Sequence, residues 1–243
     1  MRLIFIRHAE PDYENHSVTE KGFREIACLA KRVSGWKNVK AAYVSPLARA
    51  ALTAEPCLAA LGMQGTVYEW LREFWPRVDN PSLGENEILW DMFPEYFTRV
   101  PEFYDKDRWV DAPLYAGKPE VRAAWKEVCE GIDGVLAQHG YRREGNLYRM
   151  DRTITDGDDD DSVLFFCHFG ISSVILGHLI GVSPILMLHH FVSPPTGITI
   201  ANAEKRDGNA AHFRIQCYGD AAHLRENGEA LSQMAAFSPI FQG

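Results

Sequence analysis

Two short apolar runs, far apart in the chain, have the composition of buried β-strands. Residues 3–6 read Leu-Ile-Phe-Ile, and residues 163–167 read Val-Leu-Phe-Phe-Cys. Continuous apolar runs of this length are typical of strands that are covered on both faces. Histidines follow both runs, as His8 and His168. Since ligand sites of open α/β sheets lie at the carboxyl ends of strands, we expect both histidines to face one site.

Strands and helices alternate along the first part of the chain. Apolar strands are predicted at about 2–7, 41–45 and 66–71, with a helix in each interval. This β-α-β-α-β order predicts a parallel sheet that is covered by helices on both faces. Later elements are a helix at about 119–140, a hairpin at 141–150, a helix at about 171–180 and an antiparallel hairpin at 197–218. The predicted fold class is α/β, as a three-layer α/β/α sandwich with a mostly parallel central sheet.

Residues 72–120 break this regular pattern. They are rich in aromatic residues and prolines, and their periodicity is weak. We interpret them as an inserted lid lobe over the sheet's carboxyl edge, within a single domain of residues 1–243. Five aromatic residues near the expected site predict a mouth that favours an apolar or planar substrate group: Trp70, Phe74, Trp75, Trp90 and Phe169. The alternative, that such residues fill the lobe's own core, stays open because aromatic side chains bury well regardless of function.

Composition and charge narrow the classes of partner. The 243 residues carry a formal net charge of −8, and no dense run of Lys or Arg occurs. These features argue against nucleic-acid and membrane partners and favour a small anionic substrate. The five cysteines are odd in number and widely spaced, which argues against a disulfide framework and a zinc site and favours a cytoplasmic location. The first apolar run is too short for a signal peptide or a membrane span. A homodimer remains open.

The residues at the predicted strand ends indicate phosphate chemistry. Arg7 and His8 are adjacent, and either His8 attacks phosphorus while Arg7 grips the phosphate oxygens, or the two form a surface pair. Arg49 favours the first interpretation, because it lies in the first turn of the helix after the second strand. A helix N-terminus already attracts anions through free N–H groups.

Together these residues resemble the histidine phosphatase superfamily, whose fold is phosphoglycerate-mutase-like. The resemblance covers about 1–70 and 160–225. The family motifs R-H-G-E, L-T-x-x-G, S-x-L-x-R-A-x-x-T-A and S-H-G correspond to Arg7-His8-Ala9-Glu10, to Val18–Gly22, to Ser45–Ala54 and to Cys167-His168-Phe169-Gly170. Each motif is weak to moderate alone, and their common order is the stronger signal.

The resemblance implies a role for each matching residue. His8 would become phosphorylated, while Arg7, Arg49 and His168 surround the phosphoryl group. Glu73, in an L-x-E context, would protonate the leaving alcohol and later activate water. Three other acids compete for that role: Glu69, Glu85 and Asp91. The scheme requires no metal and no cofactor.

One loop departs from the family pattern. Glu14 stands where many members carry a phosphate-binding Asn, and Asn15 follows one residue later. Either Glu14 turns outward or the loop shifts, and we assign the phosphate contact to Asn15.

The predicted function is a metal-independent phosphatase that hydrolyses phosphomonoesters through phospho-His8. Its substrate would be small and phosphorylated, with an apolar or planar part. Two alternatives are a cofactor-dependent phosphoglycerate mutase and a catalytically silent phosphate-binding protein of the same fold. The lobe's basic residues are diluted by acids and aromatics, which favours the phosphatase over the mutase.

Overall fold

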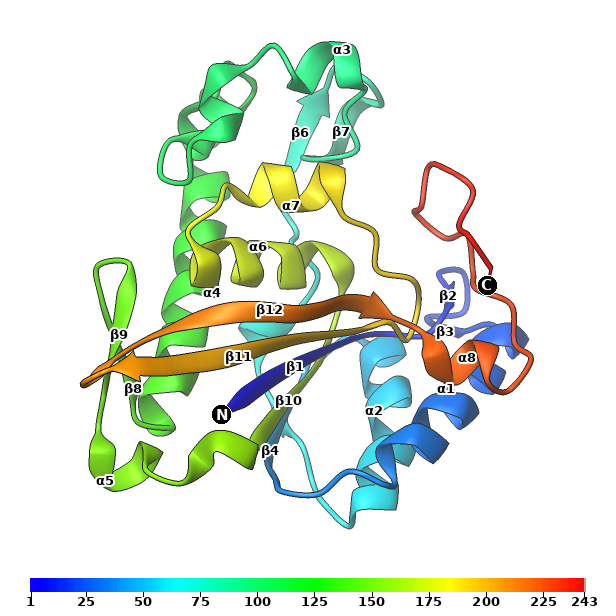
Figure 1. The fold of residues 1–243 in the computed structure, drawn as a ribbon. Helices are drawn as coiled ribbons and strands as arrows, with labels where there is room; N and C mark the ends of the chain where they lie inside the picture. Colours follow the sequence, from blue (N-terminus) through cyan, green and yellow to red (C-terminus); the bar gives the residue numbers. More distant parts are fainter. Residues whose placement is uncertain (243) are drawn as a thin grey trace.

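The computed structural model describes residues 1–242, with only the backbone of Asp207. Its centre is an eight-stranded sheet (Figure 1). In spatial order the strands are β5 (Thr66–Val67), β4 (Val39–Val44), β10 (Ser162–Cys167), β1 (Arg2–Arg7), β11 (Ile198–Asp207), β12 (Ala210–Asp220), β9 (Leu147–Met150) and β8 (Tyr141–Glu144). The strands from β5 to β1 pair in parallel, whereas those from β1 onward through β11 to β8 pair antiparallel. The predicted α/β fold class is therefore confirmed, with a parallel core and an antiparallel extension.

The two apolar runs of the sequence are the central strands β1 and β10. They pair in parallel with Arg7 opposite Cys167, so the following histidines leave adjacent strand ends. Alternate residues face opposite sides of the sheet, as the pleat requires. Phe5 and Phe165 stack on one side at a ring-centroid distance of 4.9 Å, whereas Ile6 belongs to the core on the other side.

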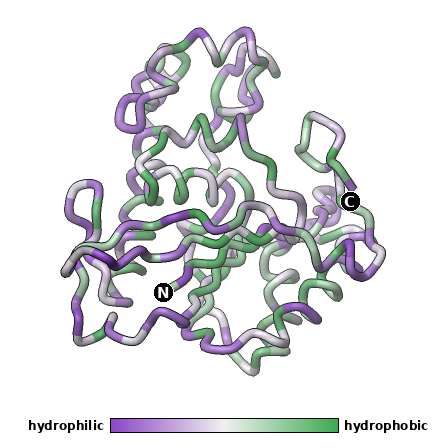
Figure 2. The backbone as a smooth tube through the Cα atoms, viewed as in Figure 1, coloured by the Kyte–Doolittle hydropathy of each residue, from purple (hydrophilic) through white to green (hydrophobic). Residues whose placement is uncertain are grey.

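Helices cover both faces of the sheet (Figure 1). On one side lie α1 (Glu20–Val33) and α2 (Ala48–Leu61), and α8 (Ala222–Arg225) contacts α1. On the other side lie α4 (Pro119–Gln138), α6 (Phe169–Ile180) and α7 (Pro184–His190). Figure 2 shows α6 and the central strands as mostly hydrophobic, which fits a helix that is buried nearly all round.

Residues 72–120 form small elements beyond α7 (Figure 1). They comprise a two-stranded sheet of β6 (Arg77–Asn80) and β7 (Gly84–Ile88), then α3 (Pro94–Phe97) and three 3₁₀ turns at 101–104, 109–111 and 113–115. Phe103, Trp109 and Tyr115 are buried in the same core as α4 and α6. Of the five aromatic residues expected at the mouth of the site, Phe74, Trp90 and Phe169 are buried in this core too, so the alternative of a core role holds for them. The division into one domain with a lobe stays a prediction.

Several short elements complete the chain. They are β2 (Pro11–Asp12), β3 (Ser17–Val18), α5 (Arg152–Thr155) and two 3₁₀ turns, η1 (Glu69–Leu71) and η5 (Asp158–Asp160). The predicted strand at 66–71 is wrong beyond Val67, because η1 occupies the following residues. Within residues 1–242, no helix has both the length and the apolar composition needed to span a membrane.

Candidate active site

His8 lies at the carboxyl end of β1, with one ring nitrogen fixed by the backbone. Its Nδ1 lies 2.7 Å from the carbonyl oxygen of Ala9, which can only accept, so Nδ1 carries the proton. Nε2 is then free to accept a hydrogen bond from Nε of Arg49 at 3.2 Å. Burial and the charges of Arg7 and Arg49 hold the pKa of His8 well below its ordinary 6.5. The ring is therefore neutral near pH 7, with a lone pair on Nε2.

His168 stands beside it, between β10 and α6. The two imidazole centroids are 5.0 Å apart. Nε2 of His168 lies 2.6 Å from the hydroxyl of Ser45, and Nδ1 has no hydrogen-bond partner among the described residues. Burial, together with nearby His8 and both arginines, holds the pKa of His168 well below 6.5. The two rings therefore lie side by side at adjacent strand ends, but His168 is fully buried and, unlike His8, does not line the cavity described below. Contact of one phosphoryl group with both rings stays a prediction.

Two arginines add positive charge to this pair. Arg7 is 6% exposed; it donates from Nη1 to the carbonyl oxygen of Ser193 at 2.5 Å, and its Nε has no partner among residues 1–242. Arg49 is half-buried, and its guanidinium lies 5.5 Å from the ring centroid of Tyr13. Neither guanidinium has a carboxylate within 4 Å in the described part of the chain. Both charges are thus available to an anion.

Glu73 lies beside His168, at the N-terminus of α6. Its carboxylate accepts hydrogen bonds from the amides of Phe74 at 2.8 Å, Gly170 at 3.3 Å and Ile171 at 2.9 Å. A side chain at Gly170 would not fit, because a Cβ there would lie 2.6 Å from Oε1 of Glu73 and 2.7 Å from the ring of Trp90. The glycine after the second histidine therefore allows this carboxylate to approach the helix.

Asp91 is a second carboxyl group on the cavity, and the motifs gave it no role. Its backbone has a φ of 64°, a conformation that costs energy in residues other than glycine and is frequent at functional sites. Burial, and next the charge of Glu73, raise the pKa of Asp91 to about 6. Such a carboxyl group can hold or release a proton near neutral pH.

The loop after β1 places Asn15 away from the other predicted residues. Its side-chain amide donates to Asp12 at 2.7 Å within an exposed turn. Glu14 is exposed as well, so it turns outward. From this loop Tyr13 and His16 line the cavity. The local hydrogen bond between Asp12 and Asn15 satisfies the amide that was assigned to phosphate.

All the remaining predicted residues except His168 line one cavity of about 740 Å³. His8, Arg7, Arg49 and Glu73 contribute to it, together with Asp91. Of the five aromatic residues expected at its mouth, four line it: Phe74, Trp75, Trp90 and Phe169. Trp70 instead packs against α4, where a Cβ at Gly131 would lie 2.4 Å from its ring.

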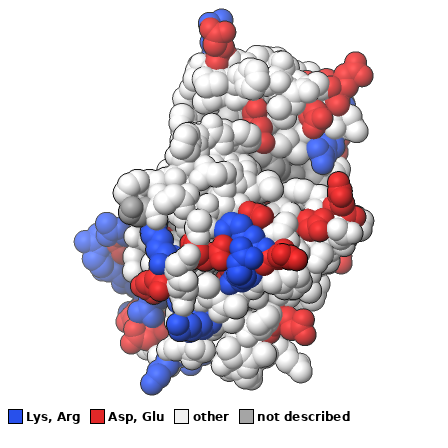
Figure 3. Space-filling view, turned by 90° about the vertical axis from the view of Figure 1, so that its right-hand side faces the viewer, with Lys and Arg blue, Asp and Glu red and all other residues white. Residues whose placement is uncertain are grey.

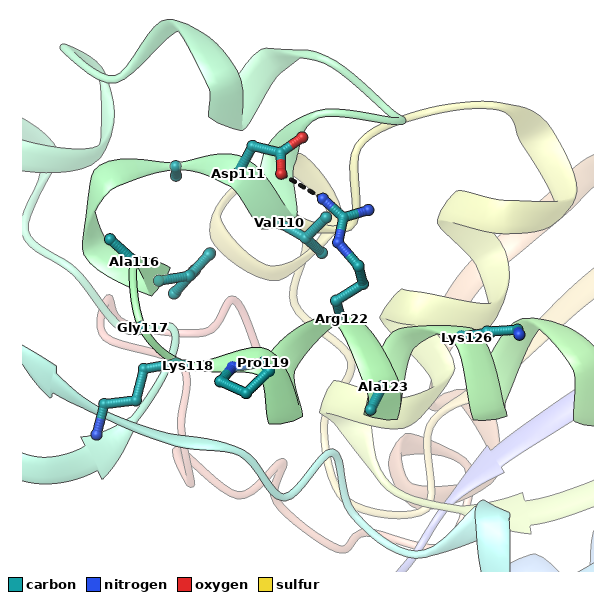
Figure 4. Close-up of a pocket in the computed structure, with 11 residues that line it drawn as sticks. Val110, Asp111, Ala116, Gly117, Lys118, Pro119, Arg122, Ala123 and Lys126 are labelled. Carbon is teal, nitrogen blue, oxygen red and sulfur yellow. Dashed lines mark hydrogen bonds and ion pairs between the residues drawn. The ribbon is translucent and has the colours of Figure 1, made fainter.

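The cavity lies on the side of the molecule toward which β1 and β10 run. Figure 3 faces that side, where Lys and Arg gather mainly in the lower half. A separate cavity of about 580 Å³, between residues 110–118 and the start of α4, contains none of the predicted site residues (Figure 4). There Arg122 donates to Asp111.

Two residues that the sequence left without a role support the site. Ser45 contacts His168, as described above. The hydroxyl of Thr53 accepts from the amide of Ala9 at 3.0 Å and donates to the carbonyl oxygen of Arg49 at 2.7 Å. Both residues lie in the motif that contains Arg49, and this position is the sequence feature that could have indicated their contact with the site.

Comparison with known proteins agrees with this geometry. Residues 3–103 match the family model described as histidine phosphatase superfamily (branch 1). The resemblance to this superfamily is confirmed. No curated protein matches the chain in sequence.

Solved structures share the fold at low sequence identity. A phosphoserine phosphatase mutant from Entamoeba histolytica, in complex with phosphoserine, has a TM-score of 0.57 and 18% identity, covering 92% of this chain and 98% of its own. The mycobacterial glucosyl-3-phosphoglycerate phosphatase has a TM-score of 0.56 and 15% identity, covering 90% and 98%. YhfR of Bacillus stearothermophilus has a TM-score of 0.56 and 19% identity, covering 92% and 98%. These likenesses establish the phosphoglycerate-mutase-like fold of the histidine phosphatases.

Proposed function

We propose that this chain is a phosphatase that hydrolyses phosphomonoesters through a phosphohistidine on His8. The observation that carries the proposal is the geometry at His8: Nδ1 is fixed by the carbonyl oxygen of Ala9, and Nε2 lies on the cavity side, where it accepts from Arg49. Two of the structures with this fold are named as phosphatases, for phosphoserine and for glucosyl-3-phosphoglycerate.

In the first step, Nε2 of His8 attacks the phosphorus atom. A nitrogen–phosphorus bond forms, and the bond from phosphorus to the ester oxygen breaks. Arg7 and Arg49 stabilise the negative charge on the phosphoryl oxygens, which is the main catalytic device in phosphoryl transfer. The proposal assigns this charge stabilisation to side chains alone, without a metal.

The leaving alcohol then needs a proton, and the second step needs a base. We assign both roles to Glu73, which would protonate the alcohol and then accept a proton from the water that attacks the phosphohistidine. This attack forms an oxygen–phosphorus bond and breaks the nitrogen–phosphorus bond, so inorganic phosphate leaves and His8 is restored.

Of the three competing acids, Glu69 and Asp91 line the same cavity and Glu85 does not. Glu69 pairs with Arg72, which leaves Asp91 as the main competitor. General acid–base assistance of this kind contributes on the order of 10² to 10⁴ in rate.

The charges around the cavity favour a phosphatase over a phosphoglycerate mutase. A mutase must bind the carboxylate of phosphoglycerate as well as its phosphate. Of the four arginines that line the cavity, Arg72 pairs with Glu69 and Arg77 pairs with Glu87 at 3.8 Å. Arg7 and Arg49 are left for the phosphate, so no further unpaired arginine lines the cavity for a carboxylate.

The first test is hydrolysis of 4-nitrophenyl phosphate in the presence of EDTA. We expect activity that resists EDTA and falls at least about 10⁴-fold in His8→Ala, because the nucleophile is removed. His212→Ala, a change at an exposed histidine on β12, is the matched control and retains activity. Activity that persists in His8→Ala, or that EDTA abolishes in the native protein, contradicts the proposal. Interconversion of phosphoglycerates with a bisphosphate primer would instead support the mutase.

A further inference from the structure

A second cavity adjoins the phosphate cavity. Its volume is about 590 Å³, and three residues, Asp91, Phe169 and Ala235, line both cavities. Its walls come from four separate parts of the chain: residues 83–97, Phe169 at the start of α6, the end of α7 with the residues that follow it, and 235–238 near the C-terminus. The two cavities are therefore neighbours, with these three residues between or beside them.

The second cavity, which we call the apolar pocket, is lined mostly by hydrophobic side chains. Several of them are solvent-exposed, notably Phe93 at 62% and Phe237 at 77%, with Leu83, Phe191 and Val192 each above 40%. Grouped exposed apolar side chains of this kind mark binding surfaces. The pocket volume lies in the usual range for a site that encloses a small organic ligand.

Charge in the apolar pocket is sparse and of one sign. No Lys or Arg is among the residues of the described chain that line it, and Asp91 is its single acidic residue. His189 is held neutral, since Nδ1 donates to the carbonyl oxygen of Ile185 and Nε2 accepts from the amide of Met92. Burial lowers the pKa of His189 as well. His190 also lines the pocket. An anionic group in this pocket would meet Asp91 without a Lys or Arg among the described lining residues to compensate it.

We propose that the apolar pocket binds the organic group of the substrate, and that the substrate is a phosphate ester of an uncharged, apolar alcohol. This inference rests on the proposed phosphatase function. In this proposal the phosphoryl group binds at Nε2 of His8, and the organic group of the ester extends along the cavity toward the apolar pocket. The residues common to both cavities then lie where the ester oxygen joins the organic group. Phe169 lines both cavities, and its ring centroid lies 5.7 Å from the guanidinium of Arg7 in the phosphate cavity.

A chain-length series tests the proposal. Methyl, butyl and hexyl phosphate differ in buried apolar area while their ester chemistry stays alike. Each buried methylene is worth up to about fourfold in affinity, so kcat/KM should rise by at least about 30-fold from methyl to hexyl phosphate. The phosphate ester of 6-hydroxyhexanoate has a similar length but ends in a carboxylate, and it should lose most of this gain. Equal kcat/KM for methyl and hexyl phosphate would overturn the proposal.

A variant of the pocket wall provides the structural control. Phe93 is the N-cap of α3 without a side-chain capping bond and is largely exposed, so Phe93→Asp introduces a favourable capping residue while adding charge to the pocket. We expect it to remove about tenfold or more of the hexyl advantage while leaving methyl phosphate unaffected. The matched control is Phe23→Asp on α1, which is 52% exposed and belongs to neither cavity. An unchanged chain-length dependence in Phe93→Asp contradicts the pocket assignment.

A binding measurement separates this inference from the phosphatase proposal. Hexylphosphonate cannot be hydrolysed, and its affinity relative to methylphosphonate can be measured by calorimetry. Tighter binding of hexylphosphonate that Phe93→Asp abolishes, without any hydrolysis of the esters, keeps the pocket and rejects the phosphatase. Hydrolysis of the esters without chain-length dependence keeps the phosphatase proposal and rejects the pocket assignment. If light scattering shows a native dimer that Phe93→Asp dissociates, again without chain-length dependence, a second copy of the chain covers the pocket and the inference fails.

Discussion

The phosphate cavity and the apolar pocket share three residues but are built in different ways. In the phosphate cavity, backbone groups and buried side chains fix each functional atom: Ala9 holds His8, Ser45 contacts His168, and the start of α6 binds Glu73. In the apolar pocket, exposed side chains such as Phe93 and Phe237 stand on short segments with few such bonds.

This difference separates the chemistry from the choice of substrate. The ends of β1 and β10 lie inside a packed core, so the positions of His8 and His168 depend on the whole sheet. The walls of the pocket depend on peripheral segments, which tolerate change more readily. Substitutions in the first region should alter turnover of every substrate, whereas those in the second should alter the preference among substrates.

The largest effect expected in the phosphate cavity, apart from loss of His8, concerns the proton donor. Glu73→Gln should lower kcat for alkyl phosphates by about 10² to 10⁴, because an alkoxide leaves poorly without a proton. The loss should be much smaller for 4-nitrophenyl phosphate, whose leaving group needs little protonation. Asp91→Asn should change both rates less than tenfold. The opposite ranking of the two variants, measured by steady-state kinetics on both esters, would make Asp91 the donor.

A smaller effect should follow from removing the hydroxyl that contacts His168. Ser45→Ala is expected to lower kcat/KM by about tenfold at most, since a typical hydrogen bond contributes roughly 1 kcal/mol. In a His168→Ala background the same change should add nothing, because Ser45 acts through that ring. Ser34→Ala, at an exposed serine whose hydroxyl donates to the carbonyl oxygen of Lys31, is the control. Additive losses in the double variant would show a role for Ser45 apart from His168.

The smallest predicted effect is on the free energy of unfolding, and it arises at Glu25, which bonds the backbone of the loop after β1. Glu25 is buried; it accepts from the amide of Glu10 at 2.8 Å and lies 3.6 Å from Lys21. Burial raises the pKa of Glu25 from 4.5 to about 6, so the folded state favours its protonated form. The resulting stabilisation is full below pH 4.5 and is lost as the pH rises to 6.

Glu25→Gln has no such loss and should therefore be more stable than the native protein above pH 6. We expect a gain of about 1–2 kcal/mol in the free energy of unfolding at pH 7.5, and no gain at pH 4.5. Urea unfolding at both pH values measures it, with Glu55→Gln, at an exposed site on α2, as the control. A variant that is equally destabilised at both pH values would show that the ion pair with Lys21 outweighs the cost of burial.

Much of the phosphate cavity followed from the sequence, because its parts depend on strong local signals. The apolar runs before His8 and His168 can only be buried strands, and a strand end fixes where the next residue emerges. The helix after Ser45 placed Arg49 in its first turn in the same way. Asn15 was misplaced because a local hydrogen bond to Asp12 competes with any ligand, and this depends on the turn conformation.

The apolar pocket left no comparable signal in the sequence. Its walls join residues 83–97, Phe169, 188–192 and 235–238, which no periodicity connects. The third strand also ended earlier than its composition indicated, because Thr66 and Val67 form an exposed edge pair and the chain then turns into η1. Tertiary contacts decide such features, and they appear only once the segments are placed together.

The most direct test of the proposed phosphohistidine on His8 is to trap the phosphorylated protein. Rapid quenching during turnover of a ³²P-labelled monoester should give about one acid-labile, base-stable label per molecule, located on His8 by peptide mapping. The label should be absent from His8→Ala and should persist longer in Glu73→Gln. Hydrolysis that proceeds without a trapped label, or a label found on any residue other than His8, would contradict the central claim.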